Sequence, residues 1–350
     1  MWVEVLVIGI KLAVVLAALL TTVPIMVWVE RRASALMQDR LGPNRVGPFG
    51  LFQPVVDAVK LITKEDLIPR DVSRFLFILA PVVALTVALS TFIAVPFGSD
   101  TGLELFGHAV RGFIVAPDLN IGVLYIFAIA SLAVYATVLA GWASNNKYSL
   151  YGGIRASAQT ISYELAMTIS VVGVLMASSS LHLHQVVEAQ TGTWLGVLPR
   201  WNVCTQLLGA ITFMVAAFAE TNRIPFDLPE AEAELVSGYL TEYSSMKYAA
   251  FFMGEYVHMT VASALMTVLF FGGWTLPWID LAFAGWIGGL LSIGIFCAKV
   301  AFFLFFFVWV RWTLPRFRFD QLMALGWKVM IPLSVLNFLW VGFAIAAGIM

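Results

Sequence analysis

The sequence predicts an all-α, polytopic membrane protein: a bundle of eight tilted transmembrane helices with a cytoplasmic-side amphipathic surface helix. Of its 350 residues, 61% are hydrophobic and only 12% are charged, whereas about a quarter are charged in a soluble domain. Apolar runs that could cross a hydrocarbon core of ~30 Å recur along the chain. Lys and Arg gather in alternate connections. A net charge of −1 gives no indication of nucleic acid as a partner, and none is expected.

The apolar runs define the eight expected spans, since a helix needs ~20 apolar residues to cross the core. They lie near residues 5–29, 75–97, 121–142, 158–178, 203–219, 248–272, 286–310 and 329–349. The first and seventh runs are longer than needed, which indicates tilt. The fifth is short, so we expect its helix to continue through Glu220 to Asn222 before Pro225 ends it. No repeat or linker divides the chain, so we expect 1–350 to form a single transmembrane domain.

The positive charges of the connections predict the orientation. Most Lys and Arg residues follow the first, third, fifth and seventh spans, whereas the other connections hold only Arg111 and Arg200. The positive-inside rule therefore puts the richer loops in the cytoplasm and both termini outside. We expect a surface helix and loop at about 43–70 and an acidic cytoplasmic loop at about 220–247.

The first cytoplasmic loop has the pattern of a helix lying on the membrane. In GLFQPVVDAVKLITKED, one helical face carries Phe52, Val55, Val56, Val59 and Ile62, and another carries Asp57, Lys60 and Lys64. This segment is too short and too charged to span, which favours a surface helix. The preceding Gly42, Gly47 and Gly50 stand among prolines and predict turns.

Charged residues inside the apolar runs are functional candidates. Glu164, Glu255 and Lys299 interrupt spans, and Glu220 lies near the end of one. A charge near the bilayer centre costs about 2.5–3.5 kcal/mol on insertion scales. Carboxyl groups in apolar surroundings can hold and release protons near neutral pH, which a proton path requires. Alternatively, Glu164 and Glu255 bond neighbouring helices together or pair with Lys299.

The segment AETNRIPFDLPEAEAELVSGYLTEY concentrates acids beside the single cation Arg223. Its carboxylates are Glu220, Asp227, Glu230, Glu232, Glu234 and Glu242. Asp227, Pro229 and Glu230 also fit the start of a short helix, where the helix dipole favours acids. A helix start explains Asp227 and Glu230 better than it explains all six carboxylates.

Metal ligands are sparse. Cys204 and Cys297 lie far apart in apolar runs. An iron–sulfur cluster or a structural zinc ion normally needs several thiolates close together. Glu255 and His258 have the spacing of half a di-iron site, but the second half is missing from the sequence. We therefore expect no metal.

Two long motifs resemble a known family: ERRASALMQDRLGPNRVGPFGLFQPVVDAVKLITKED at 30–66 and AETNRIPFDLPEAEAELVSGYLTEYSSMKYAAFFMGEY at 219–256. With NNKYSLYGGIRASAQTISYE and WVRWTLPRFRFDQLMALGWK, they closely resemble the subunit 1 family of proton-pumping NADH-quinone oxidoreductase, respiratory complex I. The resemblance covers essentially the whole chain. One departure is Ser245, where the family usually has glycine. The resemblance implies a subunit without its own redox centre in an electron-transport enzyme that translocates protons.

The resemblance also implies roles for single residues. Arg31, Arg40, Asp57 and Lys60 would line or shape a quinone tunnel, and Arg223 and Phe226 would belong to a mobile loop beneath the quinone cavity. The proton path would comprise Glu164, Glu220, Glu255, Asp227, Glu230, Glu232 and Glu234. Quinone, as ubiquinone, would be the substrate, while FMN, NADH and iron–sulfur clusters would be bound by other subunits.

Partners and location follow from the same resemblance. The partners would be the terminal-cluster and quinone-site subunits of the peripheral arm, small membrane subunits and lipids. The location would be the bacterial inner (cytoplasmic) membrane, with the mitochondrial inner membrane as the alternative.

Two other functions fit an apolar bundle with buried acids. A homologous membrane subunit of a hydrogenase or formate hydrogenlyase would share the fold without binding quinone. A free-standing ion transporter would be favoured by inverted repeats and broken helices, and the sequence indicates neither.

Overall fold

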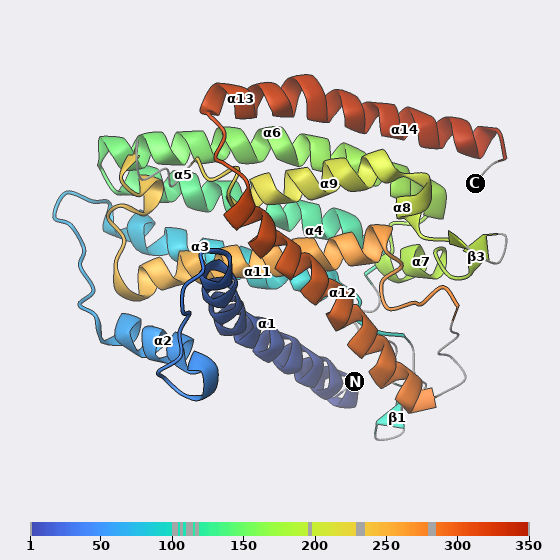
Figure 1. Ribbon diagram of the computed structural model, residues 1–350, viewed down its shortest axis with the longest axis horizontal. Helices are drawn as coiled ribbons and strands as arrows, with labels where there is room; N and C mark the ends of the chain where they lie inside the picture. The colour runs from blue at the N-terminus through green and yellow to red at the C-terminus, as the bar shows by residue number, and fades with distance from the viewer. Residues whose placement is uncertain are drawn as a thin grey trace.

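The computed structural model describes residues 2–99, 104–105, 108–109, 115, 119–194, 198–228, 235–278 and 285–348. This part of the chain is almost entirely helical, which confirms the all-α prediction (Figure 1). Its strands are two short antiparallel pairs, β1 (Glu104–Leu105) with β2 (His108–Ala109) and β3 (Thr193–Trp194) with β4 (Leu198–Pro199).

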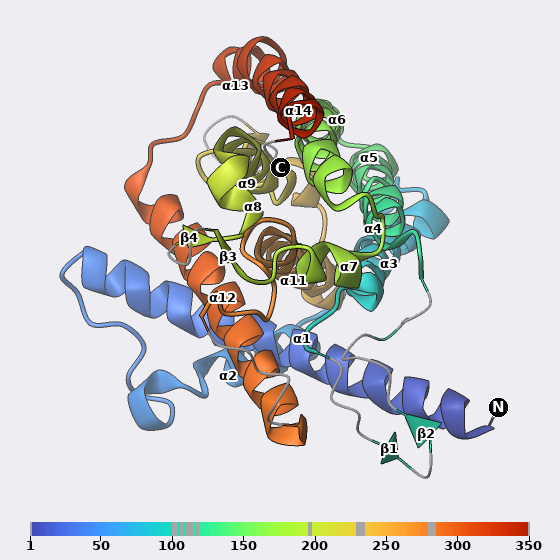
Figure 2. The same ribbon diagram turned by 90° about the vertical axis from the view of Figure 1, so that its right-hand side faces the viewer.

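Long helices make up the bundle and short ones connect them. The long elements are α1 (Trp2–Met37), α3 (Arg74–Thr91), α4 (Gly122–Ala130) with α5 (Ala133–Ala143), α6 (Lys147–Ser178), α9 (Leu207–Glu220), α11 (Ser245–Phe270), α12 (Gly285–Thr313) and α14 (Ile331–Ala346). The shorter ones are η1 (Pro48–Gly50), α2 (Gln53–Thr63), η2 (Phe92–Ala94), α7 (Leu183–Glu188), α8 (Asn202–Thr205), η3 (Gly238–Leu240), α13 (Phe319–Leu325) and the π turn η5 (Gly326–Met330). α1 and α12 cross the other helices obliquely, as expected for tilted spans (Figures 1 and 2).

Seven helices in the described ranges are long and apolar enough to cross a membrane. The predicted fifth span is shorter than expected, because α9 has only 14 residues and so covers about 21 Å of a ~30 Å core. A break at Gln206, with φ −129° and ψ 48°, separates it from α8. The expected extension to Asn222 is wrong, because Asn222 takes a left-handed φ of 50° and the helix ends at Glu220.

Two other spans contain irregular turns. α4 and α5 form one span, and the Ser131 and Leu132 between them keep right-handed helical angles. The π turn η5 joins α13 to α14 in another span. Hydropathy stays high through such turns, and therefore the apolar runs give no sign of them.

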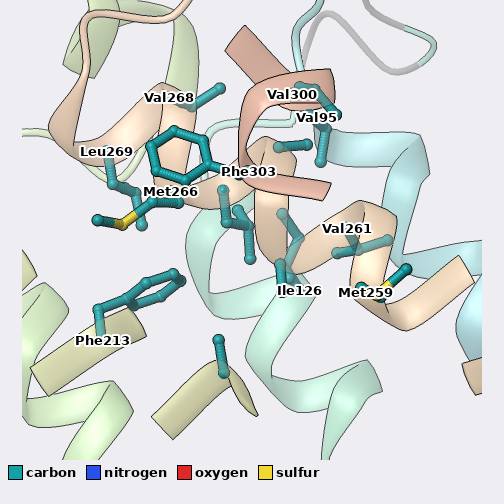
Figure 3. Packing of buried hydrophobic residues seen from close by; sticks show 14 of the residues in the cluster. Val95, Ile126, Phe213, Met259, Val261, Met266, Val268, Leu269, Val300 and Phe303 are labelled. Atoms are coloured by element: carbon teal, nitrogen blue, oxygen red, sulfur yellow. The ribbon is translucent and has the colours of Figure 1, made fainter. Parts of the chain in front are cut away.

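Helix α11 lies at the centre of the bundle. In its most apolar window 78% of residues are buried, against 17% in α1. It contacts α1, α3, α9 and α12, and the end view in Figure 2 shows it enclosed by other helices. Figure 3 shows its Met259, Val261, Met266 and Leu269 among Ile126, Phe213, Val300 and Phe303 of neighbouring helices. Polar groups on α11 are therefore held inside protein.

The predicted surface helix is present as α2, with its apolar residues exposed along one face. The turn before it requires glycine at position 50: φ is +73°, and an added Cβ would lie 2.2 Å from the Pro43 carbonyl oxygen. Gly47 has the same φ, which confirms the predicted turns at these two positions.

The connection from α2 to α3 is tied to the start of α11. Ser245 Oγ donates to the Leu61 carbonyl at 3.0 Å, the Leu67 N–H donates to Ser244 Oγ at 3.2 Å, and Lys247 Nζ lies 2.5 Å from Asp66 Oδ1. Ser245 has φ +55°, a conformation in which glycine is free of strain. Its hydroxyl bond to Leu61 is a contact that glycine could not make.

Close packing of α6 on η3 gives the first prediction. A Cβ on Gly152 would lie 2.6 Å from the Tyr239 nitrogen and 2.7 Å from the Gly238 Cα, both backbone atoms. We expect Gly152→Ala to destabilise the protein by about 1–3 kcal/mol through overpacking, measured as a lower thermal-unfolding midpoint in detergent. Gly294→Ala is the control, because nothing lies within 4 Å of its added Cβ. Equal midpoints for the two variants would contradict the packing described.

Candidate functional site

Charged side chains from four parts of the chain meet inside the bundle around Glu30. This residue lies near the end of α1 and is only 5% exposed. Tyr256 Oη donates to Glu30 Oε2 at 2.5 Å, and Arg223 Nη1 lies 3.4 Å from both carboxylate oxygens. Arg311 Nη1 also donates to Glu30 Oε1. These residues and Glu255 form the buried charge cluster.

Arg223 bridges the two acids of this cluster. It is 3% exposed, and its Nε lies 2.6 Å from Glu255 Oε1. Its guanidinium carbon lies 4.2 Å from the centre of the Tyr256 ring, a cation–π distance. Burial disfavours its charge, but Glu255, Tyr256 and Glu30 outweigh burial and raise the pKa of Arg223 above its ordinary value. The guanidinium therefore stays charged.

Helix geometry explains why Glu30 and Arg31 have different surroundings. Consecutive residues on a helix project about 100° apart, so Glu30 faces the bundle while Arg31 faces α2. Arg31 Nη1 lies 2.5 Å from Asp57 Oδ2 on that helix, and Gln53 Nε2 donates to Asp57 Oδ1 at 3.1 Å. The end of α1 thus connects the surface helix with the buried charge cluster.

The four basic and acidic residues expected near a quinone tunnel are only partly brought together. Arg31 and Asp57 form the pair described above. Arg40 is exposed and its Nε donates to Gln38 Oε1 at 2.6 Å, and Lys60 is exposed on α2.

A buried glutamine fixes the first part of the acidic loop. Gln159 Nε2 lies 2.8 Å from the carbonyl oxygens of Ala219 and Phe226 and 3.1 Å from Asn222 Oδ1. Phe226 itself is 4% exposed and packs against the Tyr163 ring, with centroids 5.4 Å apart. Phe226 therefore anchors the loop to α6.

Asp227 is the next acid along this loop. Arg316 Nη2 donates to its Oδ2 at 2.8 Å, while its buried Oδ1 has no hydrogen-bond partner among the described residues. Burial raises the pKa of Asp227 above its ordinary value, and the opposing charges of Arg316 and Arg311 offset this only in part. The other expected acids of the loop, Glu230, Glu232 and Glu234, lie outside the described residues.

A cavity adjoins the buried charge cluster. It has a volume of about 60 Å³ and a mainly apolar lining, to which Glu220, Glu255, His258, Thr221 and Asn222 add polar groups. A space of this size has room for a few water molecules beside those polar groups.

Glu164, on α6, is half-buried, and its charge acts on Glu220. The structure thus brings two of the membrane acids into one cavity and the third into electrostatic range of it.

Lys299 does not pair with these acids. Its Nζ donates to the carbonyl oxygens of Phe271, Gly273 and Thr275 at 2.8, 2.9 and 2.8 Å. The alternative that Glu164 or Glu255 pairs with Lys299 is therefore wrong. The carbonyl groups that follow α11 attract a cation, so Lys299 is stabilised there without a carboxylate partner.

Sequence reasoning missed four polar residues of the site: Glu30, Tyr256, His258 as a cavity residue, and Arg311. Glu30 and Arg311 stand at the ends of apolar runs beside other charged or aromatic residues, so they looked like membrane-surface residues. Within the described ranges, no three His, Cys, Asp or Glu residues are grouped to hold a metal ion.

Fold and site together define a polytopic membrane protein with paired charges beside a cavity in its helix bundle. The chain belongs to the NADH dehydrogenase family, whose family model matches residues 10–342, so the resemblance seen in the sequence is confirmed.

Curated relatives cover nearly the whole chain, and each is a subunit of an NADH-quinone oxidoreductase. The chain is 49% identical to the relative from Cytophaga hutchinsonii, covering 91% of this chain and 90% of the relative. It is 45% identical to the relative from Bdellovibrio bacteriovorus, over 98% and 97%. It is 47% identical to NADH-quinone oxidoreductase subunit 8 of Rhodothermus marinus, over 95% of both chains.

Breaking a buried ion pair should cost far more than breaking an exposed one. Glu30→Gln leaves Arg311 without its counter-charge and removes one of the two carboxylates beside Arg223, and we expect a loss of about 3–5 kcal/mol. Asp57→Asn makes the same chemical change in the more exposed Arg31 pair and should cost about 0–1 kcal/mol. Thermal unfolding of both variants in detergent measures the difference. Similar losses would show that the cluster is not desolvated.

Asp227 should make stability depend on pH. Because its folded-state pKa lies above the unfolded value of about 3.9, the folded protein binds more protons between these two values, and stability falls as the pH rises through that window. We expect Asp227→Asn to be more stable than the wild type at pH 7, with the gap shrinking toward about pH 4. Unfolding midpoints across this range check the sign. A variant less stable than wild type at pH 7 would contradict it.

Proposed function

We propose that this chain is the membrane subunit of NADH-quinone oxidoreductase that forms the quinone-binding tunnel and couples quinone reduction to proton translocation through buried carboxylates. The observation that carries the proposal is the buried charge cluster, which lies between the Arg31–Asp57 pair on one side and the cavity of Glu220 on the other. The relatives are named as subunits of NADH-quinone oxidoreductase, which supports the choice of this enzyme in the proposal.

The tunnel would begin where α1 meets α2. Quinone is neutral with an apolar tail, so its path needs apolar walls and a few polar groups for its head. The exposed apolar face of α2 supports a route for the tail. Arg31, Arg40, Asp57, Lys60, Arg223 and Phe226 are the residues that we propose shape this tunnel.

Proton coupling would use the acids around Arg223. Reduction of quinone to quinol takes up two electrons and two protons. If nearby carboxyl groups supply these protons, they must be protonated again in each turnover. Arg223 stabilises two carboxylates at once. A change of charge in the loop that carries Asp227 would alter this balance and so change the proton affinity of Glu255.

Glu255 shares a cavity with Glu220, and Glu220 interacts with Glu164. The proposed proton path therefore contains Glu164, Glu220, Glu255 and Asp227, with Glu230, Glu232 and Glu234 supplied by the loop beyond. The electrons, NADH, FMN and iron–sulfur clusters belong to other subunits in this proposal.

The assembly would include the terminal-cluster and quinone-site subunits of the peripheral arm and neighbouring small membrane subunits. The bacterial origin of the relatives supports a place in a bacterial inner membrane. We propose ubiquinone as the quinone.

The experiment uses the assembled enzyme in membrane vesicles with Glu220→Gln, Arg223→Met and Asp57→Asn. We expect Glu220→Gln to lower proton pumping about tenfold or more, since a positioned acid–base group contributes about 10²–10⁴-fold. Arg223→Met should lower both pumping and quinone reduction. Asp57→Asn should lower quinone reduction directly, and any loss of pumping should follow from that. NADH-dependent quinone reduction and vesicle acidification are the measurements.

Glu188→Gln is the matched control, because this carboxylate is 62% exposed on α7 and takes no part in the cluster. It should keep wild-type activity. Full activity and pumping in all three test variants, with normal assembly, would remove the assignment.

A further inference from the structure

His258 lies between two cavities inside the bundle. The larger cavity, described above, adjoins the acidic loop. A second cavity of about 10 Å³, the inner cavity, is lined by residues of α3, α4, α6, α9 and α11. The residues that line both are Glu220 and His258. Both cavities are lined mainly by apolar residues, and these two side chains are the polar groups that they share.

The surroundings of His258 leave its imidazole free to exchange protons. The titratable residues lining the two cavities are Glu220, Tyr239, Glu255 and His258. Among the described residues, neither His258 nor Glu220 has a hydrogen-bond partner on the protein. Thr91, the one hydroxyl lining the inner cavity, donates instead to the Ala88 carbonyl at 2.7 Å.

Packing alone explains His258 poorly. A polar ring within the membrane is costly unless it bonds to a partner or serves a function, and Val261 and Ala262 fill the same region with apolar atoms. A neutral imidazole can accept a proton at one nitrogen and release one from the other. It can therefore transfer a proton from one cavity to the other without leaving its position.

We propose that His258 is a proton-transfer residue that extends the path of the buried acids from Glu220 to the inner cavity. In the first step, the O–H bond of the Glu220 carboxyl breaks and an N–H bond forms on the imidazole, which gives a carboxylate and an imidazolium. In the second step, the imidazolium loses the proton on its other nitrogen to a water molecule in the inner cavity. The inference rests on the proposed function, since the proton reaches Glu220 from the cluster beside the quinone site.

The test uses the assembled enzyme in membrane vesicles carrying His258→Ala or His258→Gln. Glutamine keeps hydrogen bonding but cannot carry a proton, so we expect pumping per NADH oxidised to fall about tenfold or more in both variants. Added imidazole should restore pumping in the alanine variant, because the free base fits the space left by the side chain. Pyrrole, which has a similar shape but no basic nitrogen, should not.

Val261→Ala is the control for packing, because it enlarges the inner cavity without removing a titratable group. It should pump at the wild-type level. Full pumping in His258→Gln would overturn the inference, and so would a loss in the alanine variant that imidazole and pyrrole restore equally. If the alanine variant does not assemble, the glutamine variant decides.

Glu220→Gln in the same vesicles separates this inference from the proposed function. Loss of pumping in Glu220→Gln with full pumping in His258→Gln contradicts only the role of His258. Full pumping in Glu220→Gln contradicts the proposed proton path itself.

Discussion

The structure depends on one constraint: a charge removed from water must be met by an opposite charge or by hydrogen bonds. Moving an ion into the interior costs several kcal/mol, and only close, well-directed partners offset that cost. Glu30 meets this condition with two guanidinium groups and a phenol. Because these partners come from α11, α12 and the loop after α9, the same pairing fixes how the ends of four segments meet.

The cluster contains two carboxylates and two guanidinium groups, so it is neutral as a whole when all four are ionised. Neutrality makes the group sensitive to its surroundings, since a charge gained or lost at any member leaves another without compensation. A cavity lies beside it, and Glu255 belongs to both the cluster and the lining of that cavity.

Hydropathy and charge predicted the fold class, seven long spans and the surface helix. A helix that crosses the lipid core needs ~20 mostly apolar residues, and such runs are visible in the sequence. Hydropathy and charge could not predict the break at Gln206 or the end of α9, which depend on local backbone angles and on Gln159. Glu164, Glu220 and Glu255 were found because acids in apolar runs are conspicuous. Glu30 was missed because Arg31 and Arg32 follow it, and only the rotation of the helix shows that it turns inward. Partners such as Arg311, 281 positions away, follow from tertiary packing alone.

The attachments of α2 have a mechanical consequence. Asp57 ties this helix to α1, whereas Leu61, Asp66 and Leu67 tie its far end to the first residues of α11. With these attachments, α2 cannot shift independently of α1 and α11. A displacement of α2 would therefore act on α1 and α11, the two helices that carry Glu30 and Glu255.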